Sequence, residues 1–257
     1  MSSPDDLDDR KYRAPALEKG LDVLELLSDH GTPMTPSQMS AVLGRSVSEL
    51  FRMIQVLEFR GYIEQSPGGY RLTNRLFTLG MAQAPVKTLV EAALPVMREL
   101  VQATWQSCHL VASSEEQIVV VARIEGPGDL GFSVRIGYRR NMIEATSGLM
   151  LYGLASARAR EELRRRLIKR HGKALFKTFE AEAAAAAAQG YARRPSDFVK
   201  GVTDLSAPVM GADGVLAALI TPYIERTPPA CDIDTALAHL RRAALTISAA
   251  TGAVSQA

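Results

Sequence analysis

Apolar side chains recur every three or four positions through the first sixty residues, which is the spacing of helices that bury one face. The stretch 16–27 places Leu17, Leu21 and Leu24 on one side of a predicted first helix. This helix is expected to end near His30-Gly31, because glycine commonly terminates helices.

Two capping boxes mark the next two helices. Thr35 and Gln38 open a short helix that Gly44 closes, and Ser46 and Glu49 open a third helix. Two helices of this size joined by a tight turn at a glycine form a helix-turn-helix. The β-prone runs 62–65 and 70–73 flank a turn sequence and predict a hairpin after the third helix. Three helices and a hairpin make a winged helix-turn-helix.

The pattern divides the chain into four regions. Residues 1–13, which include four aspartates, are expected to form a disordered acidic N-terminus before the winged helix-turn-helix of 14–75. Helical spacing with a break at Pro85 predicts linker helices over 76–104. From 105 to 257 the period changes, which predicts a second domain with an antiparallel sheet and helices packed on it. The fold class is therefore α+β.

Alternation of apolar and polar residues locates the strands of this second domain, and helical spacing locates its helices. Strands are expected over 107–112, 118–124, 132–136, 202–209 and 215–221. Helices are expected over 148–156, 160–170, 180–189 and 233–250.

Composition is that of a globular chain, with 47% hydrophobic residues, 23% charged residues and a net charge of +2. No apolar run approaches the roughly 18–20 residues that span a bilayer, so no membrane crossing is expected. The first ten residues lack the apolar stretch of a secretory signal, which favours a cytoplasmic location. Cys108 and Cys231 are too few for a disulfide framework and are interpreted as buried thiols.

The third predicted helix carries the candidate DNA contacts. In a helix-turn-helix the N-terminal side chains of this helix face base edges in the major groove. Arginine can pair with guanine or bind phosphate, serine can contact either, and glutamate can accept a hydrogen bond from a cytosine amine. The candidates are Arg45, Ser46, Ser48, Glu49 and Arg52, with Arg71 on the wing. The alternative is a small-molecule-binding or enzymatic protein whose winged helix mediates protein contacts only.

Other motif-like patterns are interpreted as structural. Residues 126–131 spell G-x-G-x-x-G after a predicted strand, but a dinucleotide site needs a helix to begin there, and a strand is expected instead. The cysteines and histidines lack metal-ligand spacing, so neither a metal nor a cofactor is expected. No nucleophile motif is present, so the chain is not expected to be an enzyme. The basic run 158–170 is interpreted as a solvated helix face.

Short motifs along nearly the whole chain resemble those of IclR-type transcriptional regulators. They are the first helix 16–27, the segment 38–52, Gly61-Tyr62-Ile63 with Tyr70-Arg71-Leu72, Gly190-Tyr191-Ala192, Gly201-Val202, Ala207-Pro208-Val209 and Ile247-Ser248. In the recognition helix Ser48 and Arg52 match the usual residues, whereas Val47 and Glu49 stand where Lys and Thr are common.

This resemblance implies a winged helix-turn-helix that binds double-stranded DNA, a linker helix used in dimerisation, and a C-terminal GAF-like domain that binds a small-molecule effector. Many such regulators respond to organic or aromatic acids and form dimers or dimers of dimers. The resemblance places the effector pocket at Thr146, Ser147, Gly148, Asp204 and Thr221. His109, at the end of a predicted strand, is interpreted as a packed or pocket-lining histidine.

Two physical expectations accompany this pocket. A helix N-terminus with Thr146 and Ser147 is a good receptor for a carboxylate, because the dipole and the free amides favour an anion. The same two residues are equally well explained as an ordinary N-cap. Asp204 would repel a carboxylate effector unless it were protonated or paired.

Overall fold

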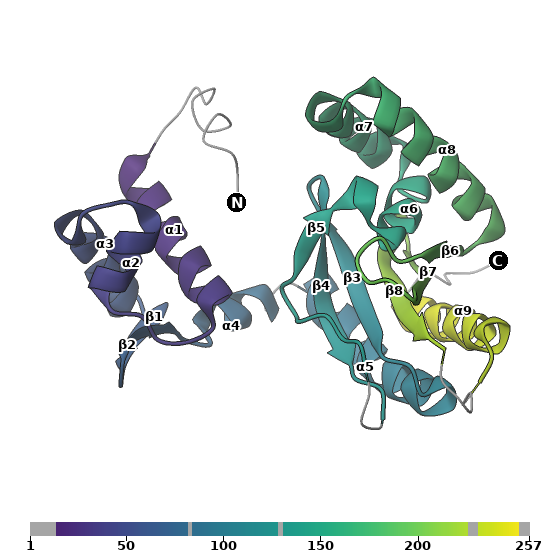
Figure 1. The fold of residues 1–257 in the computed structure, drawn as a ribbon, viewed down its shortest axis with the longest axis horizontal. Coiled ribbons are helices and arrows are strands. Elements are labelled where there is room, and N and C mark those ends of the chain that lie inside the picture. The colour runs from purple at the N-terminus through teal and green to yellow at the C-terminus, as the bar shows by residue number, and fades with distance from the viewer. Residues whose placement is uncertain (1–13, 82–83, 128–130, 226–230, 252–257) are drawn as a thin grey trace. The chain divides into compact units, whose positions relative to one another are not determined.

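The computed structural model describes residues 14–81, 84–127, 131–225 and 231–251 (Figure 1). The predicted acidic N-terminus, residues 1–13, lies outside this part of the chain. The chain divides into two compact units with the boundary after Ala84. Each unit has a hydrophobic core of its own.

A winged helix-turn-helix forms the first unit. Its core contains Val23 and Leu27 from the first helix, Met39 from the second, and Leu50 and Ile54 from the third. The two strands form an antiparallel hairpin, the wing. The elements are α1 (Pro15–His30), α2 (Pro36–Leu43), α3 (Val47–Phe59), β1 (Ile63–Ser66), β2 (Gly69–Leu72) and α4 (Arg75–Met81).

Both predicted capping boxes are present. The N–H of Gln38 donates to Oγ1 of Thr35 at 3.3 Å, and the Gln38 side chain accepts from the N–H of Thr35 at 2.8 Å. Ser46 and Glu49 form the equivalent bonds at 3.3 Å and 3.1 Å. Each box satisfies donors that a helix start leaves unpaired. The two capping boxes therefore determine where α2 and α3 begin. Gly44, which has a left-handed backbone conformation, ends α2 between these two starts.

The wing is attached to the segment before α2 by backbone pairing. The N–H of Met34 donates to the carbonyl of Tyr70 at 3.0 Å, and the N–H of Tyr70 donates to the carbonyl of Met34 at 2.8 Å. A Cβ on Gly69 would lie 2.3 Å from the Met34 carbonyl, so this close approach requires glycine. The hairpin is therefore held against the helices.

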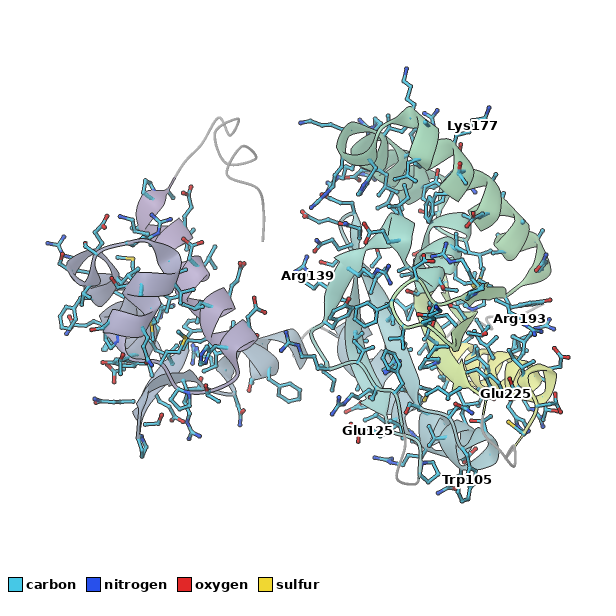
Figure 2. The ribbon with its side chains drawn as sticks, viewed as in Figure 1. Trp105, Glu125, Arg139, Lys177, Arg193 and Glu225 are labelled. Carbon is cyan, nitrogen blue, oxygen red and sulfur yellow. The ribbon has the colours of Figure 1, made fainter. Side chains whose placement is uncertain are left out.

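In the second unit, the described residues form a six-stranded antiparallel sheet in the order β5-β4-β3-β8-β7-β6 (Figure 1). Arg139 on β5 and Arg193 on β6 mark its two edges (Figure 2). The strands are β3 (Cys108–Ser114), β4 (Gln117–Ile124), β5 (Arg139–Asn141), β6 (Ala192–Pro195), β7 (Val202–Gly211) and β8 (Gly214–Ile224). The helices are α5 (Ala84–Thr104), η2 (Met142–Glu144), α6 (Thr146–Gly153), α7 (Ala157–His171), α8 (Lys173–Gln189) and α9 (Ile233–Ala250).

Helices cover both faces of this sheet. On one face α5 and α9 contribute Met97 and Leu240 to a core that includes Leu219 of β8. On the other face α6, α7 and α8 form a second core that includes Val120 of β4 and Met150 of α6. The alternation of side chains along each strand thus supplies two separate cores.

Some predicted elements differ from the structure. The strand predicted over 132–136 is wrong, because this segment is irregular and its Val134 bonds to a side chain rather than to a neighbouring strand. The short strands β5 and β6 were not predicted, because their sequences RRN and ARRP show no apolar alternation. α8 begins at Lys173, seven residues before the predicted start at 180.

The predicted linker over 76–104 consists of two helices with different environments. α4 lies within the first unit, and nearly all of α5 lies within the second. Leu89, Ala93 and Met97 of α5 are buried in the core of the second unit. This spacing of four residues places the three side chains on one helix face, which explains why α5 packs on the sheet.

Candidate functional site

At the N-terminal end of α3, several polar side chains form hydrogen bonds with one another. Glu49 accepts hydrogen bonds from the N–H and hydroxyl of Ser46, at 3.1 Å and 2.9 Å. Its Oε1 also accepts from Nζ of Lys19 on α1 at 2.9 Å. The Lys19 hydrogen bond, followed by those from Ser46, lowers the pKa of Glu49 to about 2. Glu49 and Ser46 therefore shape the helix start and have little capacity left for DNA bases.

Two of the predicted DNA-contacting arginines are held in ion pairs. Nη2 of Arg45 lies 2.9 Å from Oδ2 of Asp22 on α1. Nη2 of Arg71 on the wing lies 2.7 Å from Oε1 of Glu64, its neighbour across the hairpin. Both pairs neutralise part of the positive charge that would attract phosphate.

Arg52 differs from these two arginines. It is exposed on α3 and has no ion pair within the described residues. Ser48 and Gln55 lie one turn before and about one turn after it on the same helix face, and both are exposed. Gln55 was missed in the sequence, although its spacing from Arg52 and its ability to pair with adenine were available signals. The structure thus presents one polar stripe of Ser48, Arg52 and Gln55.

A pocket lies in the second unit between the α6 side of the sheet and the loop 131–138. It encloses about 540 Å³ of space between protein atoms, including the part open to solvent. Its aromatic wall consists of Phe132, Tyr138 and Phe198, with ring centroids 6.3 Å apart for Phe132 and Phe198 and 5.9 Å apart for Tyr138 and Phe198. The other lining residues are His109, Val111, Ile118, Val120, Val134, Arg140, Ala145, Thr146, Ser147, Ser196, Asp204, Ile220 and Pro222.

His109 of β3 connects the sheet to the loop 131–138 on the other side of the pocket. Its Nε2 accepts a hydrogen bond from the N–H of Val134 at 2.8 Å, so the proton of the neutral ring is assigned to Nδ1. Burial, and secondarily the charge of Arg123, lower the pKa of His109 to about 4. The imidazole is therefore uncharged at neutral pH. This matches the interpretation of a packed, pocket-lining histidine.

Thr146 and Ser147 both line the pocket at the start of α6, but neither is an N-cap. Ala145 occupies the N-cap position, and no side chain caps this helix. The hydroxyl of Thr146 donates instead to Oδ2 of Asp204 at 3.3 Å. The buried hydroxyl of Ser147 has no hydrogen-bond partner within the described residues. The simple capping interpretation is therefore wrong for both.

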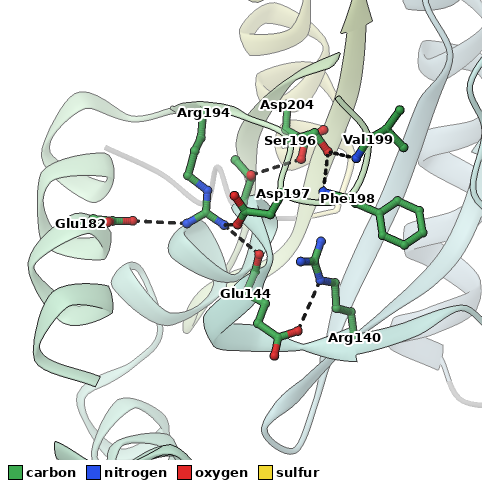
Figure 3. A network of polar contacts seen from close by, with 10 residues as sticks. Arg140, Glu144, Glu182, Arg194, Ser196, Asp197, Phe198, Val199 and Asp204 are labelled. Carbon is green, nitrogen blue, oxygen red and sulfur yellow. Dashed lines mark hydrogen bonds and ion pairs between the residues drawn. The ribbon is translucent and has the colours of Figure 1, made fainter. Parts of the chain in front are cut away.

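Asp204 is the carboxylate of the pocket. Burial raises its pKa, while hydrogen bonds from Thr146 and Ser196 and the charges of Arg194 and Arg140 act in the opposite direction. Figure 3 shows Asp204 and Ser196 in a polar network with Arg194 and Arg140. Arg140, Ser196 and the aromatic wall were not among the predicted residues, because the short β5 and the loop after β6 carry no sequence pattern that points to a pocket.

Two other predicted pocket residues do not line it. Ile220 and Pro222 of β8 face the pocket, so the alternation of the strand directs Thr221 to the opposite face, where its neighbour Leu219 is in the α5–α9 core. Gly148 has a structural role, because a Cβ there would lie 1.9 Å from the carbonyl oxygen of Met142. The glycine thus allows α6 to pack against η2.

Other chemistry receives no support from the described residues. They contain no group of three or more His, Cys, Asp and Glu side chains suited to a metal ion. None of their helices combines the length and apolar character needed to cross a membrane. The described residues 131–138, which follow the 126–131 glycine motif, form neither a helix nor a strand.

Two family models match the chain in the order of its two units. The IclR helix-turn-helix domain matches residues 16–67, and the bacterial transcriptional regulator IclR C-terminal domain matches residues 82–249. The chain belongs to the IclR family. It is therefore a ligand-responsive, DNA-binding transcriptional regulator.

Individual IclR-family proteins resemble it over most of its length. The HTH-type transcriptional regulator XynR of Escherichia coli strain K12 is 27% identical over 246 residues, which are 92% of this chain and 97% of XynR. An IclR homologue from Microbacterium hydrocarbonoxydans, crystallised with 4-hydroxybenzoate, has a TM-score of 0.77 at 22% identity and covers 92% of this chain and 98% of its own. The regulator from Alicyclobacillus acidocaldarius has a TM-score of 0.74 at 20% identity, with 94% and 100% covered. These structures share the fold.

Proposed function

We propose that α3 reads an operator half-site and that Arg52 makes its principal base contact. The observation that carries this proposal is the exposed guanidinium of Arg52, which has no ion pair within the described residues, whereas Arg45 and Arg71 are paired. A free guanidinium can bind guanine through two hydrogen bonds, which contribute about 1–3 kcal/mol of discrimination. Ser48 and Gln55 supply further polar contacts along the same face.

Fluorescence anisotropy on the promoter fragment of the protein's own gene tests this proposal, with a scrambled duplex and a salt series as references. We expect Arg52→Ala to weaken binding to the promoter fragment by about 1–3 kcal/mol and to change binding to the scrambled duplex much less. Arg242→Ala on α9 removes the same charge from an exposed position and serves as the matched control. Equal specific affinity of wild type and Arg52→Ala contradicts the role. If the protein shows no salt-dependent binding to any duplex, the result favours the alternative that the winged helix mediates protein contacts only.

The pocket of the second unit is the proposed effector site. Its largely apolar lining and its few polar groups are those of small-molecule sites. The Microbacterium hydrocarbonoxydans homologue was crystallised with a small aromatic compound, which supports a ring-sized ligand for this fold. An effector changes DNA affinity only if it binds the two regulatory states unequally.

A blocked pocket tests this assignment. Ile220→Trp places a large ring into the pocket from β8, and Ile136→Trp makes the same change at a side chain that is 60% exposed. We expect compounds that alter operator binding of the wild type to alter that of Ile136→Trp and to have no effect on Ile220→Trp. A response of Ile220→Trp equal to that of the wild type overturns the assignment.

The proposed regulator acts as a homo-oligomer that pairs its DNA-binding units. Exposed apolar side chains support this, since Leu17 and Leu21 of α1 are 62% and 48% exposed and Phe77 of α4 is 69% exposed. Paired units read two half-sites on one DNA face. Sedimentation of the wild type and of Leu17→Glu with Leu21→Glu tests it, because the charged variant should dissociate. An unchanged assembly in the variant contradicts this interface.

A further inference from the structure

We propose that Asp204 makes the effector pocket selective for uncharged, ring-sized molecules that donate a hydroxyl hydrogen, and that it disfavours carboxylates. This inference rests on the proposed effector site. The observation behind it is the position of Asp204, which lines the pocket beside the start of α6. A ligand oxygen that enters this end meets a carboxylate, which accepts hydrogen bonds and cannot donate them when ionised.

Both arginines near Asp204 have carboxylate partners within the chain. Arg194, the cross-strand neighbour of Asp204 on β6, lies 3.2 Å from Glu182 and 3.3 Å from Asp197 and donates to the carbonyl of Glu144 at 2.7 Å. Arg140 lies 3.5 Å from a carboxylate oxygen of Glu144 and over the ring of Phe198. Figure 3 shows the Arg194 guanidinium joined to Glu182 and Glu144 beside Asp197, and Nε of Arg140 directed to Glu144.

The sum of these charges is negative. Two arginines, Arg140 and Arg194, stand among four carboxylates, which belong to Glu144, Glu182, Asp197 and Asp204. His109 adds no positive charge at neutral pH, because burial lowers its pKa to about 4. An added ligand carboxylate therefore meets net repulsion in a partly dry site, where screening is weak.

The N-terminus of α6, which attracts anions, already has a carboxylate of this chain beside it. The N-terminus of α6 carries a partial positive charge. The hydroxyl of Thr146, the first residue of α6, donates to Asp204. The carboxylate of Asp204 thus lies where the carboxylate of a ligand would otherwise be favoured.

The remaining lining suits an uncharged ring with a hydroxyl group. Phe132, Tyr138 and Phe198 form an aromatic wall on which a ring can pack. The buried hydroxyl of Ser147 has no partner within the described residues, so it can bond a second polar atom of the ligand. Asp204 is the acceptor for the hydroxyl hydrogen of the ligand.

Benzyl alcohol and benzoate are matched probes, since they differ in one hydroxymethyl or carboxylate group on the same ring. Dissociation constants come from amide shifts of the ¹⁵N-labelled full chain at about pH 8, well above the ordinary range of carboxyl pKa values. We expect the wild type to bind benzyl alcohol about tenfold or more tightly than benzoate, from repulsion between charges a few ångströms apart. Shifts at Thr146 and Ser147 locate the binding.

Asp204→Asn removes the charge and keeps an acceptor for Thr146. In this variant the preference for benzyl alcohol over benzoate should fall about tenfold, chiefly because benzoate binds more tightly. Asp213→Asn, in the exposed turn between β7 and β8, is the matched control and should keep the preference of the wild type. Lower pH should strengthen benzoate binding in the wild type and in Asp213→Asn but not in Asp204→Asn, because protonation of Asp204 removes the repulsion.

Three results overturn the inference: benzoate bound as tightly as benzyl alcohol, an Asp204→Asn variant that changes both affinities equally, or no binding of either probe. The first two leave the proposed effector site intact, because a ring still occupies it. The proposed site fails separately if Ile220→Trp and the wild type respond alike to compounds that release DNA.

Discussion

Lys19 of α1 holds Glu49 of α3 through an ion pair of 2.9 Å between Nζ and Oε1. The same carboxylate closes the capping box with Ser46, so one side chain ties the start of the recognition helix to the helix packed behind it. The direction of α3 in a DNA groove therefore depends on a residue that need not touch DNA.

Glu49→Gln should reduce the stability of the first unit in a pH-dependent way. The folded pKa of Glu49, about 2, is below its ordinary value of 4.5, so its stabilising effect is present above pH 4.5 and is lost as the pH falls towards 2. Thermal melts from neutral pH downwards should show the wild type and Glu49→Gln converging. Glu25→Gln, on an exposed position of α1, should follow the wild type throughout. A constant difference at all pH values argues against the ion pair.

Gln55→Ala should relax operator specificity without a general loss of DNA binding. Its side chain carries no charge, so the salt dependence of binding should stay that of the wild type. If it pairs with an adenine, the preference at one base pair should fall by about 1–3 kcal/mol. Binding to a set of operators with single base changes measures this, and equal discrimination by wild type and variant at every position contradicts the contact.

Gly148→Ala should destabilise the second unit by about 1–3 kcal/mol or more, because its new Cβ has no room beside the Met142 carbonyl. Gly80→Ala is the matched control, since Gly80 is an exposed helical glycine with nothing within 4 Å of an added Cβ. That change should stabilise α4 by about 0.5–1 kcal/mol. Urea unfolding followed by circular dichroism measures the free energy of unfolding of both variants. An unchanged free energy for Gly148→Ala would show that α6 can shift to make room for the added Cβ.

His109 should make the second unit acid-sensitive. Its folded pKa of about 4 lies below the ordinary 6.5, so the unfolded chain binds the proton first and stability falls as the pH drops below 6.5. Between pH 6.5 and about 5 the loss should be roughly 1–2 kcal/mol. His109→Gln should lose this dependence and retain the rest of the pH profile. Denaturant midpoints of both proteins at the two pH values provide the measurement.

Local signals in the sequence predicted most of the first unit. Thr35 with Gln38 and Ser46 with Glu49 act within one helical turn, so their residue types alone located the helix starts. The roles of Arg45 and Glu49 were harder to predict, because their partners Asp22 and Lys19 lie on another helix. Sequence spacing gives no access to such tertiary pairs.

The pocket was predicted only in part, for a related reason. Its residues come from strands paired at long range and from irregular segments such as the two separate loops that carry Phe132 and Phe198. Asp204 and Thr146 were expected to be near each other through family resemblance, whereas the hydrogen bond between them came from the structure. Thr221 was placed on the wrong face, since the strand alternation at Ile220 and Pro222 directs it away.

The pairing of β3 with β8 in the middle of the sheet also affects how the chain folds during translation. Leu110 pairs with Leu219, so β3 leaves the ribosome long before its central partner exists. The DNA-binding unit needs nothing beyond α4 and can fold while the rest is still being translated. A transcript that stops before β8 therefore yields a DNA-binding head without its regulatory half, together with an open strand edge that favours aggregation.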